Sequence, residues 1–178
     1  MMPSNVRGLD FQSLSLLDAL DFAVLIEEEA RERYEEFAHQ MELHRSPEAA
    51  RFFWFMEGNE EKHRSALAAQ RKERFGDAPS RVTRAMIFDI EAPDYDEARA
   101  FMTVREALSA ALRAEEKAAA FFAAALAVVT DPGVKALFAE LHEEEVEHQR
   151  LVMVHLGRAP ADPAIHPSEF ADDPVAID

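Results

Sequence analysis

Two copies of one short motif, Glu-x-x-His, constrain the fold of this sequence more than any other feature. Glu60 and His63 form the first copy, and Glu145 and His148 form the second copy 85 residues later. Residues three apart lie on one face of an α-helix, so each copy points two metal-binding side chains in the same direction. Because glutamate is common in this chain, the motif carries information only if it lies on a buried helix face.

Apolar residues at spacings of three and four, the period of an α-helix, place both motifs on such faces. Two further helical stripes run through a single glutamate, Glu27 or Glu115. The four stripes are Leu16, Leu20, Ala23, Glu27, Ala30, Tyr34, Phe37 and Met41; Phe52, Met56, Glu60, His63 and Leu67; Val104, Leu108, Ala111, Glu115, Ala118, Phe122 and Val129; and Leu137, Leu141, Glu145, His148 and Val152. A buried carboxylate must be paired, protonated or bound to a cation, because removing an ion from water costs several kcal/mol. The stripes therefore predict a buried metal site.

The same residues form an internal repeat. The Glu-x-x-His copies are related by an offset of 85 residues, and Glu27 is related to Glu115 by an offset of 88. Such a pseudo-twofold arrangement suits two equivalent cations, each held by one lone glutamate and one histidine. Glu60 and Glu145 would then bridge the two ions. Two divalent cations would neutralise the four buried carboxylates.

Helix signals divide the chain into four long helices and two helical hairpins. The expected helices cover residues 13–43, 47–75, 103–129 and 132–156. The expected N-terminal capping residues are Ser15 with Asp18, Ser46, Thr103 with Glu106, and Asp131. The turns at 44–46 and 130–131 are short, which predicts that each pair of helices is antiparallel.

A long connection at residues 76–102 joins the hairpins, with a short helix expected at 94–101. This connection is long enough to cross the whole bundle. We therefore predict an all-α four-helix bundle over residues 1–156. A proline-rich acidic tail at 157–178 follows, which we expect to be disordered or loosely docked. The alternative is a strap onto a partner subunit or a targeting peptide for a larger assembly.

Composition excludes several classes of protein. A length of 178 residues with 48% hydrophobic content fits about one domain. A net charge of −16 argues against nucleic acid and anionic membrane surfaces as partners. The chain has no cysteine, which excludes disulfides, iron–sulfur clusters and a rubredoxin-type iron centre within it. No apolar run is long enough to span a bilayer and no signal peptide is evident, so we expect a cytoplasmic protein.

Two segments carry a family resemblance. Residues 27–34, EEEARERY, place a tyrosine seven residues after a lone glutamate, and residues 143–148, EEEVEH, follow the Asp131-Pro132 helix start. On these segments and the metal-binding residues, the chain resembles the ferritin-like superfamily, and within it the rubrerythrin branch, over residues 13–156. The resemblance implies a ferritin-like four-helix bundle with non-haem iron that reacts with dioxygen or peroxide. The ligand set is already known from di-iron carboxylate proteins.

Three departures from typical rubrerythrins limit what the resemblance implies. Ala118 stands three residues after Glu115, where rubrerythrins carry a further glutamate that takes part in a redox-dependent ligand switch. Phe122 stands at the position equivalent to Tyr34, which leaves one phenol near the expected cluster. Without cysteine there is no rubredoxin-type centre, so peroxidase turnover would need an external electron donor.

These features together predict a di-iron carboxylate oxidoreductase that reacts with dioxygen or hydrogen peroxide. Glu27, His63, Glu115 and His148 are the expected terminal ligands of two iron ions, with manganese as the alternative metal. Tyr34 is expected to order or buffer the bridging region. One alternative is a ferroxidase or an iron storage or delivery protein. Another is a metal-stabilised interaction module.

Some assignments leave an alternative open. A helix register shifted by one residue would replace Glu27 and Glu115 by their neighbours Glu28 and Glu116. The remaining histidines, which lie outside the motifs, are expected at the surface: His39, His44, His142, His155 and His166. The aromatic run at residues 52–55 is expected in the core and at a subunit interface, and a homodimer is the expected assembly.

Overall fold

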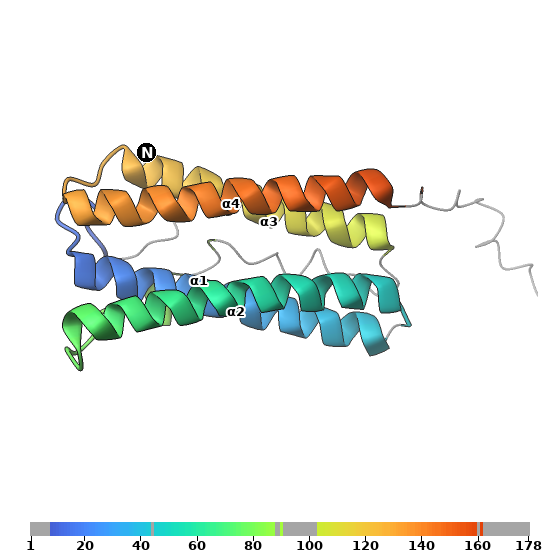
Figure 1. Ribbon diagram of the computed structural model, residues 1–178, viewed down its shortest axis with the longest axis horizontal. Coiled ribbons are helices and arrows are strands. Elements are labelled where there is room, and N and C mark those ends of the chain that lie inside the picture. Colours follow the sequence, from blue (N-terminus) through green and yellow to red (C-terminus); the bar gives the residue numbers. More distant parts are fainter. Residues whose placement is uncertain (1–7, 44, 88–89, 91–102, 160, 162–178) are drawn as a thin grey trace, which may run out of the picture.

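A computed structural model shows an all-α protein built from four long helices (Figure 1). It describes residues 8–43, 45–87, 90, 103–159 and 161. Within this part of the chain the helices are α1 (Leu16–Leu43), α2 (Pro47–Phe75), the short 3-10 helix η1 (Arg84–Met86), α3 (Val104–Leu126) and α4 (Pro132–Arg158). The predicted helices are confirmed, with ends that differ by up to three residues.

The helices form two antiparallel hairpins, α1 with α2 and α3 with α4 (Figure 1). α2 ends at one end of the bundle and α3 begins at the opposite end, as a crossover connection between the two hairpins requires. This arrangement confirms two hairpins joined by a long crossover. The short helix expected at 94–101, the tail from 162 onward, and His44 and His166 lie outside the described residues.

Three of the four expected helix caps are present. Ser15 Oγ accepts a hydrogen bond from the Asp18 backbone N–H (3.1 Å). Thr103 and Glu106 form a reciprocal capping box at α3, and the Asp131 carboxylate accepts from two backbone N–H groups at α4. These caps satisfy N–H groups that the first turn of a helix leaves without a partner.

Ser46 occupies the N-cap position of α2 and Pro47 follows at the first helical position, as expected, but the Ser46 side chain makes no capping hydrogen bond. Arg45 takes a left-handed backbone conformation (φ 59°), and Ser46 itself lies at φ −106° and ψ 68°. An N-cap residue normally has an extended backbone that turns its side chain back onto the helix. Here the tight turn between α1 and α2 prevents that geometry, and Pro47 removes one N–H that would need a cap.

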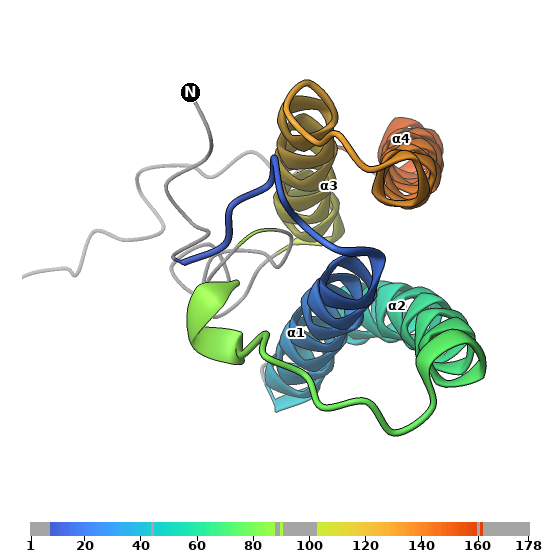
Figure 2. The same cartoon turned by 90° about the vertical axis from the view of Figure 1, so that its left-hand side faces the viewer.

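Two apolar clusters fill the bundle, one towards each end. The first contains Phe22, Phe121 and Phe138, and the second contains Phe37 and Phe53. In Figure 2, which looks along the bundle, the four helices surround this common interior. On each helix the expected metal-binding residue lies between residues of the two clusters, so the site is held at the level where they meet.

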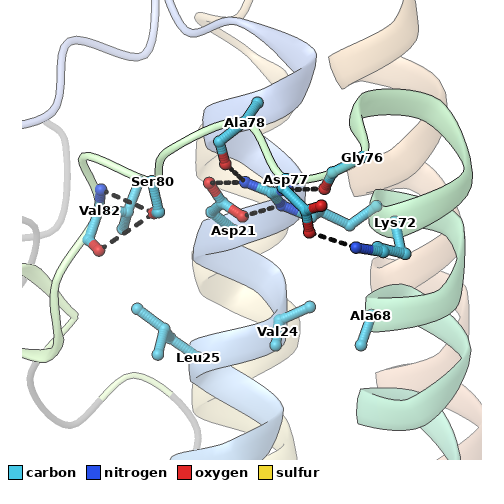
Figure 3. A pocket seen from close by; sticks show the side chains of 11 residues that line it. Asp21, Val24, Leu25, Ala68, Lys72, Gly76, Asp77, Ala78, Ser80 and Val82 are labelled. Atoms are coloured by element: carbon cyan, nitrogen blue, oxygen red, sulfur yellow. Dashed lines mark hydrogen bonds and ion pairs between the residues drawn. The ribbon is translucent and has the colours of Figure 1, made fainter.

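Ion pairs attach the first part of the crossover to α1. The Arg71 guanidinium at the end of α2 donates to Asp21 Oδ1 (2.7 Å) and to the backbone oxygens of Gly76 (2.7 Å) and Ala78 (2.5 Å). Figure 3 shows these acceptors around an open pocket between α1 and α2. One side chain thus satisfies two carbonyls of the segment that follows α2 and fixes the direction in which the chain leaves the helix.

Two more arginines continue this attachment. Arg81 binds the buried Asp18 (2.6 Å), and its guanidinium holds the pKa of that carboxyl below its usual range. Arg84 in η1 binds Glu32 (2.7 Å) and Glu28 (3.2 Å) on α1. The described first part of the crossover, residues 76–87, therefore lies along α1, and its Val82 and Ile87 belong to the first apolar cluster. Within the described residues, no helix combines the length and apolar character that a membrane span requires.

Candidate metal centre

Each of the four helices buries one glutamate in the middle of the bundle. Glu27, Glu60, Glu115 and Glu145 are each at most 1% exposed. Their neighbours Glu28 and Glu116 face outward, half-buried and exposed respectively. The helix register inferred from the apolar stripes is therefore the one that the structure has. The two Glu-x-x-His motifs also lie on inward faces.

The first group of side chains, called the inner cluster here, consists of Glu60, Glu115 and His148. One ligand atom from each lies within 4.8 Å of the others, and all three residues are buried. His148 Nδ1 is 3.2 Å from Glu115 Oε2 and 3.7 Å from Glu60 Oε1. The cluster thus joins α2, α3 and α4 at one point that is closed to solvent.

Tyr34 extends the inner cluster to α1. Its buried hydroxyl donates a hydrogen bond of 2.8 Å to Glu115 Oε1. The sequence prediction placed this phenol in the bridging region. The structure connects it instead to Glu115, which was the expected terminal ligand. Its ring stacks against Phe53, which fixes its direction.

The second group, called the outer cluster, consists of Glu27, His63 and Glu144. Their ligand atoms also lie within 4.8 Å of one another. His63 Nδ1 is 3.8 Å from Glu27 Oε2 and 3.9 Å from Glu144 Oε2. Glu27 is buried, but the His63 side chain is 23% exposed and that of Glu144 is 44% exposed. This cluster therefore reaches from the interior to the surface.

The two clusters adjoin through their histidines. The rings of His63 and His148 are stacked, with centroids 5.0 Å apart and an interplanar angle of 6°. Burial, followed by the nearby His148 ring, lowers the pKa of His63 to about 4. The His63 imidazole is therefore neutral near pH 7, which is the form that binds a metal ion. Burial also raises the pKa of the Glu144 carboxyl.

The donor set fits a pair of transition-metal ions. Two compact groups each offer two carboxylates and one imidazole, and the inner group is fully buried. Imidazole and carboxylate together suit iron and manganese. Buried carboxylates this close to one another also repel, and bound cations would remove that repulsion. Of the six ligands expected from sequence, five lie in the two clusters. Glu145 is equally buried but belongs to neither.

Glu144 is the one member of these clusters that the sequence prediction missed. The internal repeat did not indicate Glu144 as a ligand, because its counterpart 85 residues earlier is Asn59. One signal was available, since Glu144 precedes His148 by four residues and therefore lies on the same side of α4.

The sequence also predicted the exposure of residues outside the site, namely the other histidines and the aromatic run at 52–55. His39 and His155 are exposed as predicted, whereas His142 is half-buried. In the aromatic run, Phe53 is buried and Phe55 is 45% exposed. Its place in the core is thus confirmed in part, and its place at a subunit interface stays a prediction.

The fold and the donor set together define the class of ferritin-like di-iron carboxylate proteins. The rubrerythrin family model matches residues 18–156, and the chain belongs to this family.

One solved structure is similar to this chain, an uncharacterized conserved protein from Magnetospirillum magnetotacticum MS-1. It shares 26% sequence identity and superposes with a TM-score of 0.69, and the match covers 86% of this chain and 100% of that chain. Comparison with curated proteins gave no match.

Proposed function

We propose that this protein is a di-iron oxidoreductase that reduces hydrogen peroxide or dioxygen. The observation that carries the proposal is the pair of adjoining clusters, each with two carboxylates and one imidazole, at the centre of a rubrerythrin-family bundle. Two ferrous ions, when bound, each supply one electron, which together with two protons reduce one hydrogen peroxide to two waters. Manganese remains the alternative metal.

The chain's own residues would hold, enclose and position this chemistry. Glu27, His63, Glu115 and His148 are the proposed terminal ligands. Glu60 and Glu145 are the proposed bridges. Both are at most 1% exposed, which is consistent with that role. The apolar clusters on both sides exclude water from the inner cluster.

Tyr34 holds a proton next to the site. Its hydroxyl donates to Glu115 Oε1 (2.8 Å), so this carboxylate keeps a fixed direction within the inner cluster. We therefore propose that Tyr34 positions Glu115 and supplies a proton that can be shared with it.

Two other functions predict different measurements. A ferroxidase or iron storage or delivery protein would take up iron beyond two ions per chain, or release oxidised iron. A metal-stabilised interaction module would bind metal without any oxidation chemistry. An oxidoreductase would retain two metals per chain through many turnovers. A homodimeric state, a cytoplasmic location and an external electron donor belong to the same proposal, and the absence of cysteine supports the external donor.

The preference between oxidants tests the proposal. Ala118 lies fully buried on α3, one turn after Glu115, so a switching glutamate is absent there. We therefore expect the iron-loaded protein to react with dioxygen at a rate comparable to, or faster than, its rate with peroxide. Stopped-flow oxidation of anaerobically loaded protein by each oxidant measures this, and the same assay on Ala118→Glu tests the residue. A strong preference for peroxide in the wild type would make peroxidase the leading function, and no reaction with either oxidant would overturn the proposal.

A further inference from the structure

The outer cluster has a path to solvent that the inner cluster lacks. All three inner residues are buried, whereas His63 and Glu144 in the outer cluster are partly exposed. Glu144 is the most exposed of the six, with 44% of its side chain accessible. An ion arriving from water would therefore meet the outer cluster first, and would meet Glu144 before it meets Glu27.

Glu144 is placed to contact such an ion together with residues of the opposite hairpin. It extends from α4, while Glu27 and His63 belong to α1 and α2. Its Oε2 lies 3.9 Å from His63 Nδ1, and the three ligand atoms lie within 4.8 Å of one another. That spacing leaves room for one cation between the three side chains.

The internal repeat shows that this residue serves one cluster only. Its counterpart on α2 is Asn59, which carries no charge. The inner cluster therefore receives no equivalent carboxylate from the surface. The repeat relates the inner and outer clusters, but the two clusters differ because Glu144 on α4 corresponds to Asn59 on α2.

We propose that Glu144 is an additional metal ligand, specific to the position held by Glu27 and His63, and that this outer position is the one that exchanges metal with solvent. A ligand with one side in water can bind a hydrated ion before the ion loses its water, and it can release the ion by turning outward. The inner position then exchanges slowly. This inference rests on the proposed di-metal function.

Cobalt(II) is a suitable probe because it is visible by absorption and is stable in air as a bound ion. Titration of the metal-free protein should show two Co(II) per chain. Addition of a strong chelator should then remove one ion about ten-fold or more faster than the other. In Glu144→Gln the affinity of the fast-exchanging position should fall about ten-fold or more, since even the loss of a contact that supports a ligand costs about 10- to 100-fold, while the slow position stays unchanged.

Glu143→Gln is the matched control. It removes the same charge from the neighbouring, exposed position of α4. It should leave both affinities within about two-fold of wild type, since a solvated charge is screened. Thermal melts of the metal-free variants confirm that both are folded. In crystals soaked in Co(II), an anomalous map should place a Glu144 oxygen in contact with the ion held by Glu27 and His63.

The outcomes separate this inference from the proposed function. If the wild type binds fewer than two ions, both are overturned. If it binds two ions and oxidises iron, but Glu144→Gln matches Glu143→Gln or weakens both positions equally, only the inference is overturned. If Glu144→Gln weakens one position alone and no oxidation chemistry is found, the inference stands and the proposed oxidoreductase does not.

Discussion

The inner and outer clusters contain the same kinds of side chain in different surroundings. Each has one histidine and two glutamates, yet the inner cluster is closed and the outer cluster opens to solvent. Tyr34 donates to the inner cluster, and its repeat counterpart Phe122 has no hydroxyl to donate to the outer one. Glu144 belongs to the outer cluster, and its counterpart Asn59 has no charge to add to the inner one.

From this comparison we infer that the repeat supplies most of the residues of the two clusters, while the residues that differ between the halves set how open each cluster is to solvent. The phenol gives one carboxylate of the inner cluster a fixed partner. The exposed carboxylate gives the outer cluster a connection to water. We infer that a symmetric ligand set can therefore support two unequal metal positions, one retained and one exchangeable.

The most severe test removes both proposed bridging residues. Replacing Glu60 and Glu145 together by glutamine should abolish metal binding, because both metal positions would lose the carboxylates proposed to lie between them. The metal-free double variant should be as stable as the wild type or more so, since clustered buried carboxylates repel one another and are costly to desolvate. Metal analysis and melts of both metal-free proteins measure these effects.

A charge-matched control is available on the same helices. Glu61 and Glu147 form surface ion pairs with Arg64 and Arg150. Their double replacement by glutamine should leave metal binding intact and cost at most about 1 kcal/mol per pair. If the Glu60 and Glu145 double variant instead loses several kcal/mol of stability without metal, those carboxylates are structural and the comparison of two metal positions fails.

A smaller effect should follow from removing the phenol of the inner cluster. Tyr34→Phe deletes the donor of a buried hydrogen bond to Glu115, and a bond to a charged group contributes about 1.5–3 kcal/mol. We expect the metal-free variant to lose about that much free energy of unfolding, measured by chemical denaturation. The same change in a Glu115→Gln background should cost less, since the acceptor is then uncharged. Equal losses in both backgrounds would show that the contribution of the Tyr34 hydroxyl does not depend on the charge of residue 115.

The smallest effect should come from adding a phenol to the outer cluster. Phe122 is fully buried and packs against Phe138, so a new hydroxyl at either residue is costly without a partner. If the pseudo-twofold holds, the hydroxyl of Phe122→Tyr reaches Glu27 as Tyr34 reaches Glu115, and stability changes by less than about 1 kcal/mol. Phe138→Tyr, the control, should lose about 1–3 kcal/mol. Equal losses would show that the two halves differ in backbone placement as well as in sequence.

Much of the fold could be predicted because the apolar stripes are regular. Four helices, both hairpins and the inward register of Glu27 and Glu115 follow from helical period and from the position of caps. The exception at Ser46 shows the limit of local rules, since the backbone of a tight turn decides whether a capping side chain can reach. Phe11 shows another limit. It lies before α1 with no periodic signal, yet it is buried against Phe22 with ring centroids 5.6 Å apart.

The sequence predicted which types of side chain lie at the candidate site, but it did not predict which of them lie together in each cluster. Periodicity shows that a residue faces inward but does not show which residues of other helices it meets. The approach of Glu144 to His63 depends on how α4 lies beside α1 and α2, and the repeat hides it because Asn59 is its counterpart. The partner of Tyr34 is likewise a tertiary contact between α1 and α3.

The metal content of the purified protein, with anomalous maps collected at the iron and manganese edges, tests the central claim most directly. We predict two transition-metal ions per chain between the four helices. One should contact Glu60, Glu115 and His148 of the inner cluster, and the other should contact Glu27 and His63 of the outer cluster. A single ion, or zinc held by only part of this set, would contradict the account.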